Sequence, residues 1–216
     1  MGCFAYKNPM VMTFEHAVQA IIKAGNRLDQ LQLAPATSGN YSIRIGNGEM
    51  AITVSGAHKG QLSSDQIMRC ALDGTSLDDK KPSAETLLHS AIYKLFPEIN
   101  AILHTHSVAN TVLTRVLAEA DALELKGYEM LKVYPSIDTH DTVVSLPIVD
   151  NTQDIVQLSG DLEGVLTSDI PVFMIRSHGI YGWGRSMDEA SHIIEATEMM
   201  LACEMHEQQI RNYIRT

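Results

Sequence analysis

Cysteine is scarce in this sequence, and basic residues are outnumbered by acidic ones. The three cysteines, Cys3, Cys70 and Cys203, are far apart and form no C-x-x-C pair, which argues against a disulfide framework or a cysteine zinc knot and is typical of a cytoplasmic protein. The formal net charge of −10 argues against a nonspecific grip on nucleic acid or anionic lipid, because that binding depends on clustered Lys and Arg. We therefore expect a small-molecule partner, which can carry phosphate because a pocket supplies its own local donors.

Long apolar runs are missing as well. The first residues, MGCFAYKNPMVMTFEH, lack the charged and apolar regions of a signal peptide, and no apolar run approaches the length that spans a bilayer. The start Met-Gly-Cys resembles a myristoylation site, but Tyr6 stands where that site needs Ser or Thr. The sequence thus predicts no membrane partner, and we expect a cytoplasmic protein.

The sequence contains no linker or internal repeat that would divide it into domains. It also lacks the G-x-G-x-x-G turn of dinucleotide-binding folds. With 216 residues, 45% of them hydrophobic, we expect a single domain over residues 1–216. Helices are predicted after an N-cap at Thr13, over 83–95 with Ser83 as N-cap, over 107–118 and 152–166, and after a capping box of Ser186 and Glu189. Strands are predicted over 40–45, 51–54, 99–106, 143–150, 171–177 and 179–184. Tight turns between several strands favour an α/β fold whose covered sheet is mixed or largely antiparallel.

The predicted strand 99–106 carries two histidines that we expect on one face. In ILHTHS, His104 and His106 are two residues apart, so their side chains point the same way. An H-x-H pair alone is as typical of polar residues at a strand end as of half a metal site. His178 follows the buried strand 171–177 and precedes Gly179, which allows close backbone approach or an unusual turn. Three histidines that leave a coordination position open are typical of a catalytic divalent metal, with zinc the first choice, but spacing alone does not bring His178 to the pair.

Five stretches resemble, in order, the motifs of the class II aldolase and adducin family. They are SGNYSIRI, ITVSGAHKGQL, KPSAETLLHSAIY, AILHTHSVAN and VFMIRSHGIYGWGRSMDEASHIIEATE, and they run from about residue 14 to about residue 208. The resemblance implies a three-layer α/β/α sandwich around a mostly antiparallel sheet. It also implies one divalent metal per subunit on His104, His106 and His178, and a homotetramer with sites near subunit boundaries.

Two further stretches, LKGYEMLKVY and THDTVVSLPIVDNTQDI, resemble the dehydratases of this family rather than its aldolases or epimerases. The implied reaction, in methionine salvage, is metal-dependent dehydration of a 1-phosphorylated 2-ketose with a methylthio group on C5, which gives a 2,3-diketo phosphate. A metal stabilises the charge that develops when the C3 proton is removed, and an acid helps the C4 hydroxyl leave.

Two carboxylates compete for the acid and base role. Glu129 lies in the dehydratase-like GYEMLK, and we favour it, although an exposed charge in an acidic segment fits the same pattern. Glu85 in PSAETLLH matches the glutamate that lies beside the metal in the family's aldolases. A glutamate in the first turn of a helix is also favoured by the helix dipole, so Glu85 is the second candidate and a candidate metal neighbour.

The resemblance also implies a phosphate site. Its residues are Gly39, Asn40, Ser55, Gly56 and Ser83, which offer N–H groups and hydroxyls. Ala84 replaces the family's second serine. Lys59 could add a cation to this site, but an exposed loop lysine fits its position equally well, so it is left out of the set. The remaining histidines considered, which we expect at the surface or in hydrogen bonds, are His58, His89, His140 and His192.

Two alternatives stay open at this point. The chain could be an aldolase or epimerase that acts on an unmodified pentulose or methylpentulose phosphate. It could also be a non-catalytic, adducin-like binding domain. Retention of all three histidines argues against the second alternative, because a scaffold has no physical need for imidazoles that converge on one point.

Overall fold

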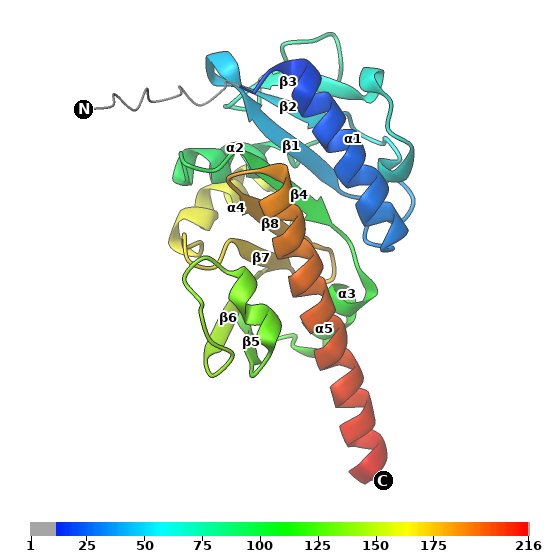
Figure 1. The fold of residues 1–216 in the computed structure, drawn as a ribbon, viewed down its shortest axis with the longest axis vertical. Coiled ribbons are helices and arrows are strands. Elements are labelled where there is room, and N and C mark those ends of the chain that lie inside the picture. Colours follow the sequence, from blue (N-terminus) through cyan, green and yellow to red (C-terminus); the bar gives the residue numbers. More distant parts are fainter. Residues whose placement is uncertain (1–11, 216) are drawn as a thin grey trace, which may run out of the picture.

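The computed structural model describes residues 12–215, and these build one eight-stranded sheet with five α-helices (Figure 1). The helices are α1 (Phe14–Gln30), α2 (Thr86–Leu95), α3 (Val108–Val116), α4 (Ile155–Asp161) and α5 (Met187–Arg215). The strands are β1 (Asn40–Ile45), β2 (Glu49–Thr53), β3 (Ile67–Ala71), β4 (Ala101–Thr105), β5 (Ala122–Lys126), β6 (Val143–Val149), β7 (Val172–Ile175) and β8 (Ile180–Gly184). Cys3 and residues 1–11 of the stretch considered above for a leader or a myristoyl group lie outside the described residues.

The sheet has the strand order β3-β2-β1-β4-β8-β7-β6-β5. Every neighbouring pair is antiparallel except β6 and β7, which are parallel. This confirms the predicted mixed, largely antiparallel sheet. The two edge strands, β3 and β5, are absent from the prediction, although the alternating burial of β5, with Leu123 and Leu125 inside, was readable from ALELK.

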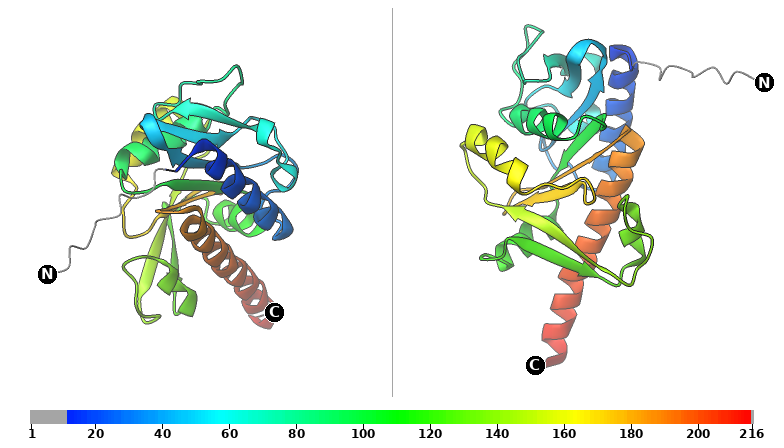
Figure 2. Two further views of the ribbon diagram at one scale, coloured as in Figure 1. Left: turned by 45° about the horizontal axis from the view of Figure 1, so that its top comes forward. Right: turned by 90° about the vertical axis from the view of Figure 1, so that its left-hand side faces the viewer.

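Helices cover both faces of the sheet. Figure 2 shows α1 (blue) and α5 (orange to red) on one side and α2 (green) and α4 (yellow) on the other. Two separate hydrophobic clusters correspond to these layers, and alternate residues of one strand enter different clusters: Leu103 packs in the first cluster and Ile102 in the second. The predicted three-layer α/β/α sandwich is therefore confirmed, while the single domain over 1–216 stays a prediction.

Three helix N-caps were predicted, and one of them is wrong. Thr13 caps α1, since its hydroxyl accepts from the N–H of His16 at 3.3 Å. The hydroxyl of Ser186 accepts from the N–H of Glu189 at 3.1 Å, but the Glu189 carboxylate accepts from the N–H of Arg185, so only half of that capping box forms. Ser83 is not the N-cap of the second helix: α2 begins at Thr86, three residues further on.

The carboxyl-terminal part of α5 projects beyond the sheet (Figure 1). It exposes apolar side chains there, with Ile210 at 59% and Ile214 at 75% exposure. No helix within residues 12–215 is both long enough and apolar enough to cross a membrane. The two cysteines of this part, Cys70 and Cys203, are free thiols.

Candidate metal centre

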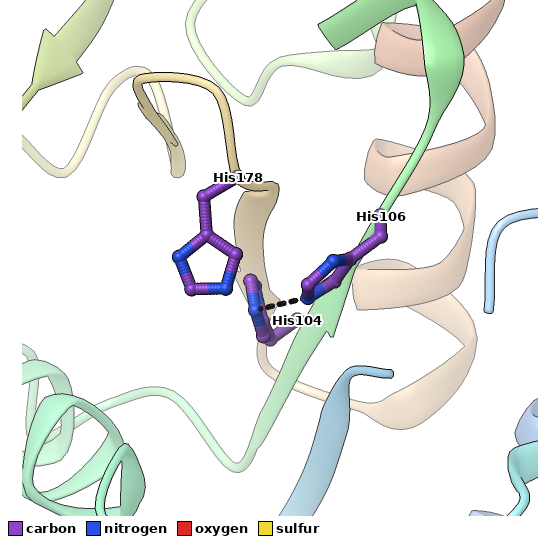
Figure 3. A group of neighbouring side chains, drawn as sticks. All are labelled: His104, His106 and His178. Carbon is purple, nitrogen blue, oxygen red and sulfur yellow. Dashed lines mark hydrogen bonds between the residues drawn. The ribbon is translucent and has the colours of Figure 1, made fainter. Parts of the chain in front are cut away.

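The sheet order brings the three predicted histidines together. His104 lies on β4, His106 follows that strand, and His178 lies in the turn between β7 and β8. Because β8 pairs with β4, the turn before β8 reaches the end of β4 that carries the H-x-H pair. One ligand atom from each imidazole lies within 4.8 Å of the others, and the Nε2 atoms of His104 and His106 are 2.9 Å apart. Figure 3 shows the three rings turned toward one another.

Two local features allow this convergence. A Cβ at Gly179 would collide with the backbone oxygen of Thr105 and press on the His104 ring, so the turn can approach β4 only with glycine there. The His104 ring also stacks on Tyr181 of β8, with a centroid distance of 4.1 Å and an interplanar angle of 15°. The close approach expected at Gly179 is thus confirmed.

His104 and His106 are held in the neutral form that binds a metal cation. The Nδ1–H of His104 donates to the carbonyl of Ile180 at 3.0 Å, which leaves the Nε2 lone pair directed at the cluster. Burial, followed by the neighbouring His106 and His178, lowers the pKa of His104 well below its usual value. Burial and the charge of His178 lower the pKa of His106 to about 4. His178 keeps a buried Nδ1 with no partner among the described residues. Two imidazoles held neutral, His104 and His106, beside the unpartnered Nδ1 of His178 are a set that a divalent metal fits.

Glu85 lies against this cluster. Its Oε1 is 3.2 Å from Nε2 of His178, and its Oε2 is 3.6 Å from Nε2 of His104. Asn40, the cross-strand partner of His104 on β1, donates from Nδ2 to Oε2 of Glu85 at 2.5 Å. Glu85 therefore lies beside the histidines, and its role as a metal neighbour stays a prediction.

A buried hydrogen-bond chain holds Asn40 in turn. The Nε2–H of His89 donates to Oδ1 of Asn40, Nδ1 of His89 accepts from the hydroxyl of Ser42 at 2.7 Å, and that hydroxyl accepts from Tyr93 at 2.9 Å. Burial lowers the pKa of His89 to about 3, so its ring stays neutral and these donor and acceptor roles are fixed. The sequence indicated only that His89 lies at the surface or in hydrogen bonds, and its link to Glu85 depends on partners far away in the chain.

Three of the five predicted phosphate residues, Gly39, Asn40 and Ser83, lie at the start of β1 or contact Glu85, while Ser55 and Gly56 follow β2. Gly39 has φ +79°, and a Cβ there would collide with the backbone oxygen of His104, so glycine is required. Ser55 and Gly56 are exposed, while the Ser83 hydroxyl accepts from the N–H of Glu85 at 3.3 Å. The Asn40 side chain is already engaged at both ends, so in this structure it orients Glu85 rather than offering a free donor.

Glu129 lies outside the histidine cluster of its own chain. Its side chain is 69% exposed, and its Oε1 forms an ion pair with Nζ of Lys132 at 2.5 Å. Its Oε2 lies 3.5 Å from Nδ1 of His140. The hydrogen bond and charge of Lys132 lower the pKa of Glu129. The favoured acid and base residue is thus not brought to the three histidines within one chain.

Glu198 is a buried carboxyl that the sequence analysis missed. It lies on α5, is 5% exposed, and its Oε1 accepts from the hydroxyl of Thr105 at 3.4 Å. Burial raises the pKa of Glu198 to about 7, against the effect of the Ser107 and Thr105 hydroxyls. Its spacing of four residues from Ile194, on the buried face of the helix, is the signal that could have found it.

A cavity of about 820 Å³ opens beside His106 and His178. Val108 and Val112 of α3 line it, together with Gln153 from the dehydratase-like stretch. The cluster therefore borders a space large enough for a small substrate.

Known proteins resemble this chain in sequence and in fold. The model of the Class II Aldolase and Adducin N-terminal domain matches residues 19–205. A methylthioribulose-1-phosphate dehydratase of Gluconacetobacter diazotrophicus is 46% identical, over 90% of this chain and 95% of its own. A protein of the same name from Marinobacter nauticus is 44% identical, over 93% of this chain and 98% of its own.

Solved structures agree on the fold. An L-fuculose 1-phosphate aldolase superposes with a TM-score of 0.77 at 21% identity, over 94% of this chain and 91% of its own. YgbL from Klebsiella pneumoniae gives a TM-score of 0.77 at 24% identity, over 89% of each chain. The match of the family model over most of the sequence, the relatives and the shared fold lead to one conclusion: this chain belongs to the class II aldolase and adducin family.

Proposed function

We propose that this chain is a zinc-dependent hydro-lyase that dehydrates 5-methylthioribulose 1-phosphate to 2,3-diketo-5-methylthiopentyl 1-phosphate, a step of methionine salvage in the cytoplasm. The observation that carries the proposal is the cluster of three converging histidines with Glu85 against it, in a chain whose relatives at 44–46% identity bear the dehydratase name.

The chain's own residues prepare the metal site. His104, His106 and His178 would hold the ion, and Zn²⁺ bound there supplies a Lewis acid for the oxygens of the substrate. Burial keeps the imidazoles of His104 and His106 neutral, and the carbonyl of Ile180 fixes the tautomer of His104. Asn40 holds the Glu85 carboxylate within 3.2 Å of His178, where it orients this ligand or exchanges a proton with substrate.

The reaction needs one base and one acid. The base removes the proton from C3, the acid protonates the C4 hydroxyl as it leaves as water, and the resulting enol takes up a proton at C4 to give the 2,3-diketone. The atoms lost are those of one water molecule. Glu129 remains our choice for this proton transfer because it lies in the stretch that resembles the dehydratases.

Glu129 reaches the substrate, in this proposal, from a second copy of the chain. Within one chain it contacts Lys132 and His140 instead of the histidine cluster. Apolar side chains exposed near both regions, Met130 at 41% and Val108 at 72%, support a subunit boundary there. In a homotetramer with its sites at such boundaries, Glu129 of a second copy would supply the carboxylate that each site lacks.

The competing proposal is an aldolase on the same scaffold, and its product distinguishes it from a dehydratase. Purified protein is incubated with zinc and either methylthioribulose 1-phosphate or dihydroxyacetone phosphate plus an aldehyde. We expect the diketone from the first mixture and no new carbon–carbon bond in the second. An aldol product without any diketone would replace the dehydratase with an aldolase.

A further inference from the structure

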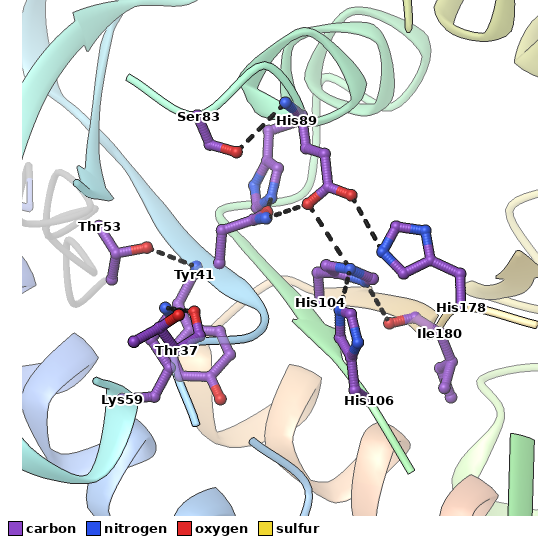
Figure 4. Close-up of polar contacts among 12 residues, drawn as sticks. Thr37, Tyr41, Thr53, Lys59, Ser83, His89, His104, His106, His178 and Ile180 are labelled. Atoms are coloured by element: carbon purple, nitrogen blue, oxygen red, sulfur yellow. Dashed lines mark hydrogen bonds and ion pairs between the residues drawn. The ribbon is translucent and has the colours of Figure 1, made fainter. Parts of the chain in front are cut away.

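Lys59 is buried between two segments that carry predicted phosphate residues. Its side chain is 1% exposed, and its Nζ donates to the carbonyls of Thr37 at 2.9 Å and Ala57 at 2.5 Å. The interpretation of Lys59 as an exposed loop lysine is therefore wrong. In Figure 4, Lys59 and Thr37 lie together, apart from the histidine cluster. One ammonium thus ties the segment before Gly39 and Asn40 to the segment that contains Ser55 and Gly56.

The backbone of Lys59 is fixed against α1. A Cβ at Gly25 would collide with the backbone oxygen of Lys59, and a Cβ at Gly60 would collide with the carboxylate of Asp29. Glycine at both positions lets the turn over residues 59–61 pack directly on the helix. The Lys59 side chain is consequently held at both ends, at its backbone by α1 and at its ammonium by the two carbonyls.

The positive charge has no carboxylate in contact. Among residues 12–215, none lies within ion-pair distance of Nζ, and the charge of Glu85 acts on it only from further away. Burial lowers the pKa of Lys59 to about 8, and Glu85 offsets part of this effect. A buried cation without an anionic partner is costly, and a phosphate bound on the adjoining segments would supply the missing negative charge.

We propose that Lys59 is a positioning residue of the phosphate site, which holds the Thr37–Asn40 and Ser55–Ala57 segments together and provides the buried positive charge that favours a phosphate dianion there. The inference rests on the proposed function, because it takes those segments as the phosphate site. Lys59 acts through the two segments and through its field, since its own side chain is not accessible.

The test uses Lys59→Met, which keeps the length of the side chain but removes the charge and both hydrogen bonds, and Lys59→Arg, which keeps the charge. Binding of inorganic phosphate to the zinc-loaded protein is measured by calorimetry, beside kcat, KM and zinc content. We expect Lys59→Met to weaken phosphate binding and raise KM by about tenfold or more, with kcat and zinc content little changed. Lys59→Arg should recover part of the loss. Lys23→Met, the same change at an exposed position of α1, should behave as wild type.

The outcomes separate this inference from the proposed function. A Lys59→Met protein with wild-type phosphate binding and KM would overturn the role of Lys59 and leave dehydration standing. Loss of phosphate binding in Lys59→Met would support the role even if the wild-type protein formed no diketone. A variant that loses zinc and kcat together with phosphate binding, and that Lys59→Arg does not rescue, would make Lys59 a general structural residue and contradict the inference.

Discussion

Asn40 donates a hydrogen bond of 2.5 Å from Nδ2 to Oε2 of Glu85, the carboxylate that lies against His178 and His104. The other end of the same amide accepts from the buried ring of His89. A core residue of β1 therefore links the packing of the sheet to the orientation of a carboxylate at the three-histidine cluster.

Removal of the Asn40 amide should lower kcat or zinc affinity more than it weakens substrate binding. In Asn40→Ala, Glu85 loses a hydrogen bond to a charged group, an interaction of about 1.5–3 kcal/mol, so kcat or zinc affinity should fall about tenfold or more. Steady-state kinetics and zinc titration measure both effects. A raised KM with unchanged kcat and zinc affinity would instead make Asn40 a phosphate ligand.

His106→Ala tests the cluster. The variant should stay folded, because His106 lies at a strand end and is partly exposed, but should bind zinc at least about tenfold more weakly and have little activity. Circular dichroism checks that the variant is folded, zinc analysis after dialysis measures metal binding, and the diketone assay measures activity. His16→Ala, a change at an exposed histidine of α1, is the matched control. Full zinc content and activity in His106→Ala would remove this residue from the site.

Glu129→Gln and Glu85→Gln should differ at saturating zinc. Glu129→Gln removes the basic oxygen but little volume, so kcat should fall roughly a hundredfold or more while zinc content stays normal. Glu85→Gln should bind zinc more weakly and recover part of its activity with excess zinc. The assignment reverses if Glu129→Gln is nearly active and zinc-loaded Glu85→Gln is dead.

Subunit mixing tests whether Glu129 acts from a second copy. If each site takes His106 from one chain and Glu129 from another, a refolded equimolar mixture of inactive His106→Ala and Glu129→Gln should regain up to about a quarter of wild-type activity, the statistical share of intact sites. A mixture as inactive as its components, with mixed oligomers shown by mass spectrometry, would place both residues in the same chain's site.

The buried Glu198 should make stability depend on pH. Its folded-state pKa lies at about 7, above the ordinary 4.5, so the protonated form is favoured in the fold; this stabilisation is complete below pH 4.5 and is lost as the pH rises through 7. Glu198→Gln stays neutral and should be more stable than wild type at pH 8 by up to about 3 kcal/mol, with no difference near pH 4.5. Denaturant unfolding at both pH values measures this, with the exposed Glu163→Gln as control. An equal stability difference at both pH values would contradict it.

The sequence predicted those features that depend on local periodicity or on motif order. The alternation of β4 places His104 and His106 on one face, and the resemblance added His178. What it did not show depends on partners distant in the chain: the pairing of β4 with β8, the link from His89 through Asn40 to Glu85, and the burial of Lys59 under α1. The edge strand β5 was missed although Leu123 and Leu125 alternate with exposed residues, whereas β3 buries Ile67, Met68 and Cys70 and shows no strict alternation.

The most direct test of the central claim is an assay of the purified protein with methylthioribulose 1-phosphate before chelation, after chelation and after zinc is restored. The three-histidine centre predicts that a diketone forms, that chelation abolishes its formation, and that zinc at about one ion per chain restores it. Undiminished diketone formation by protein shown to be free of divalent metal would contradict the metal centre, and no diketone from zinc-loaded protein would contradict the proposed dehydration.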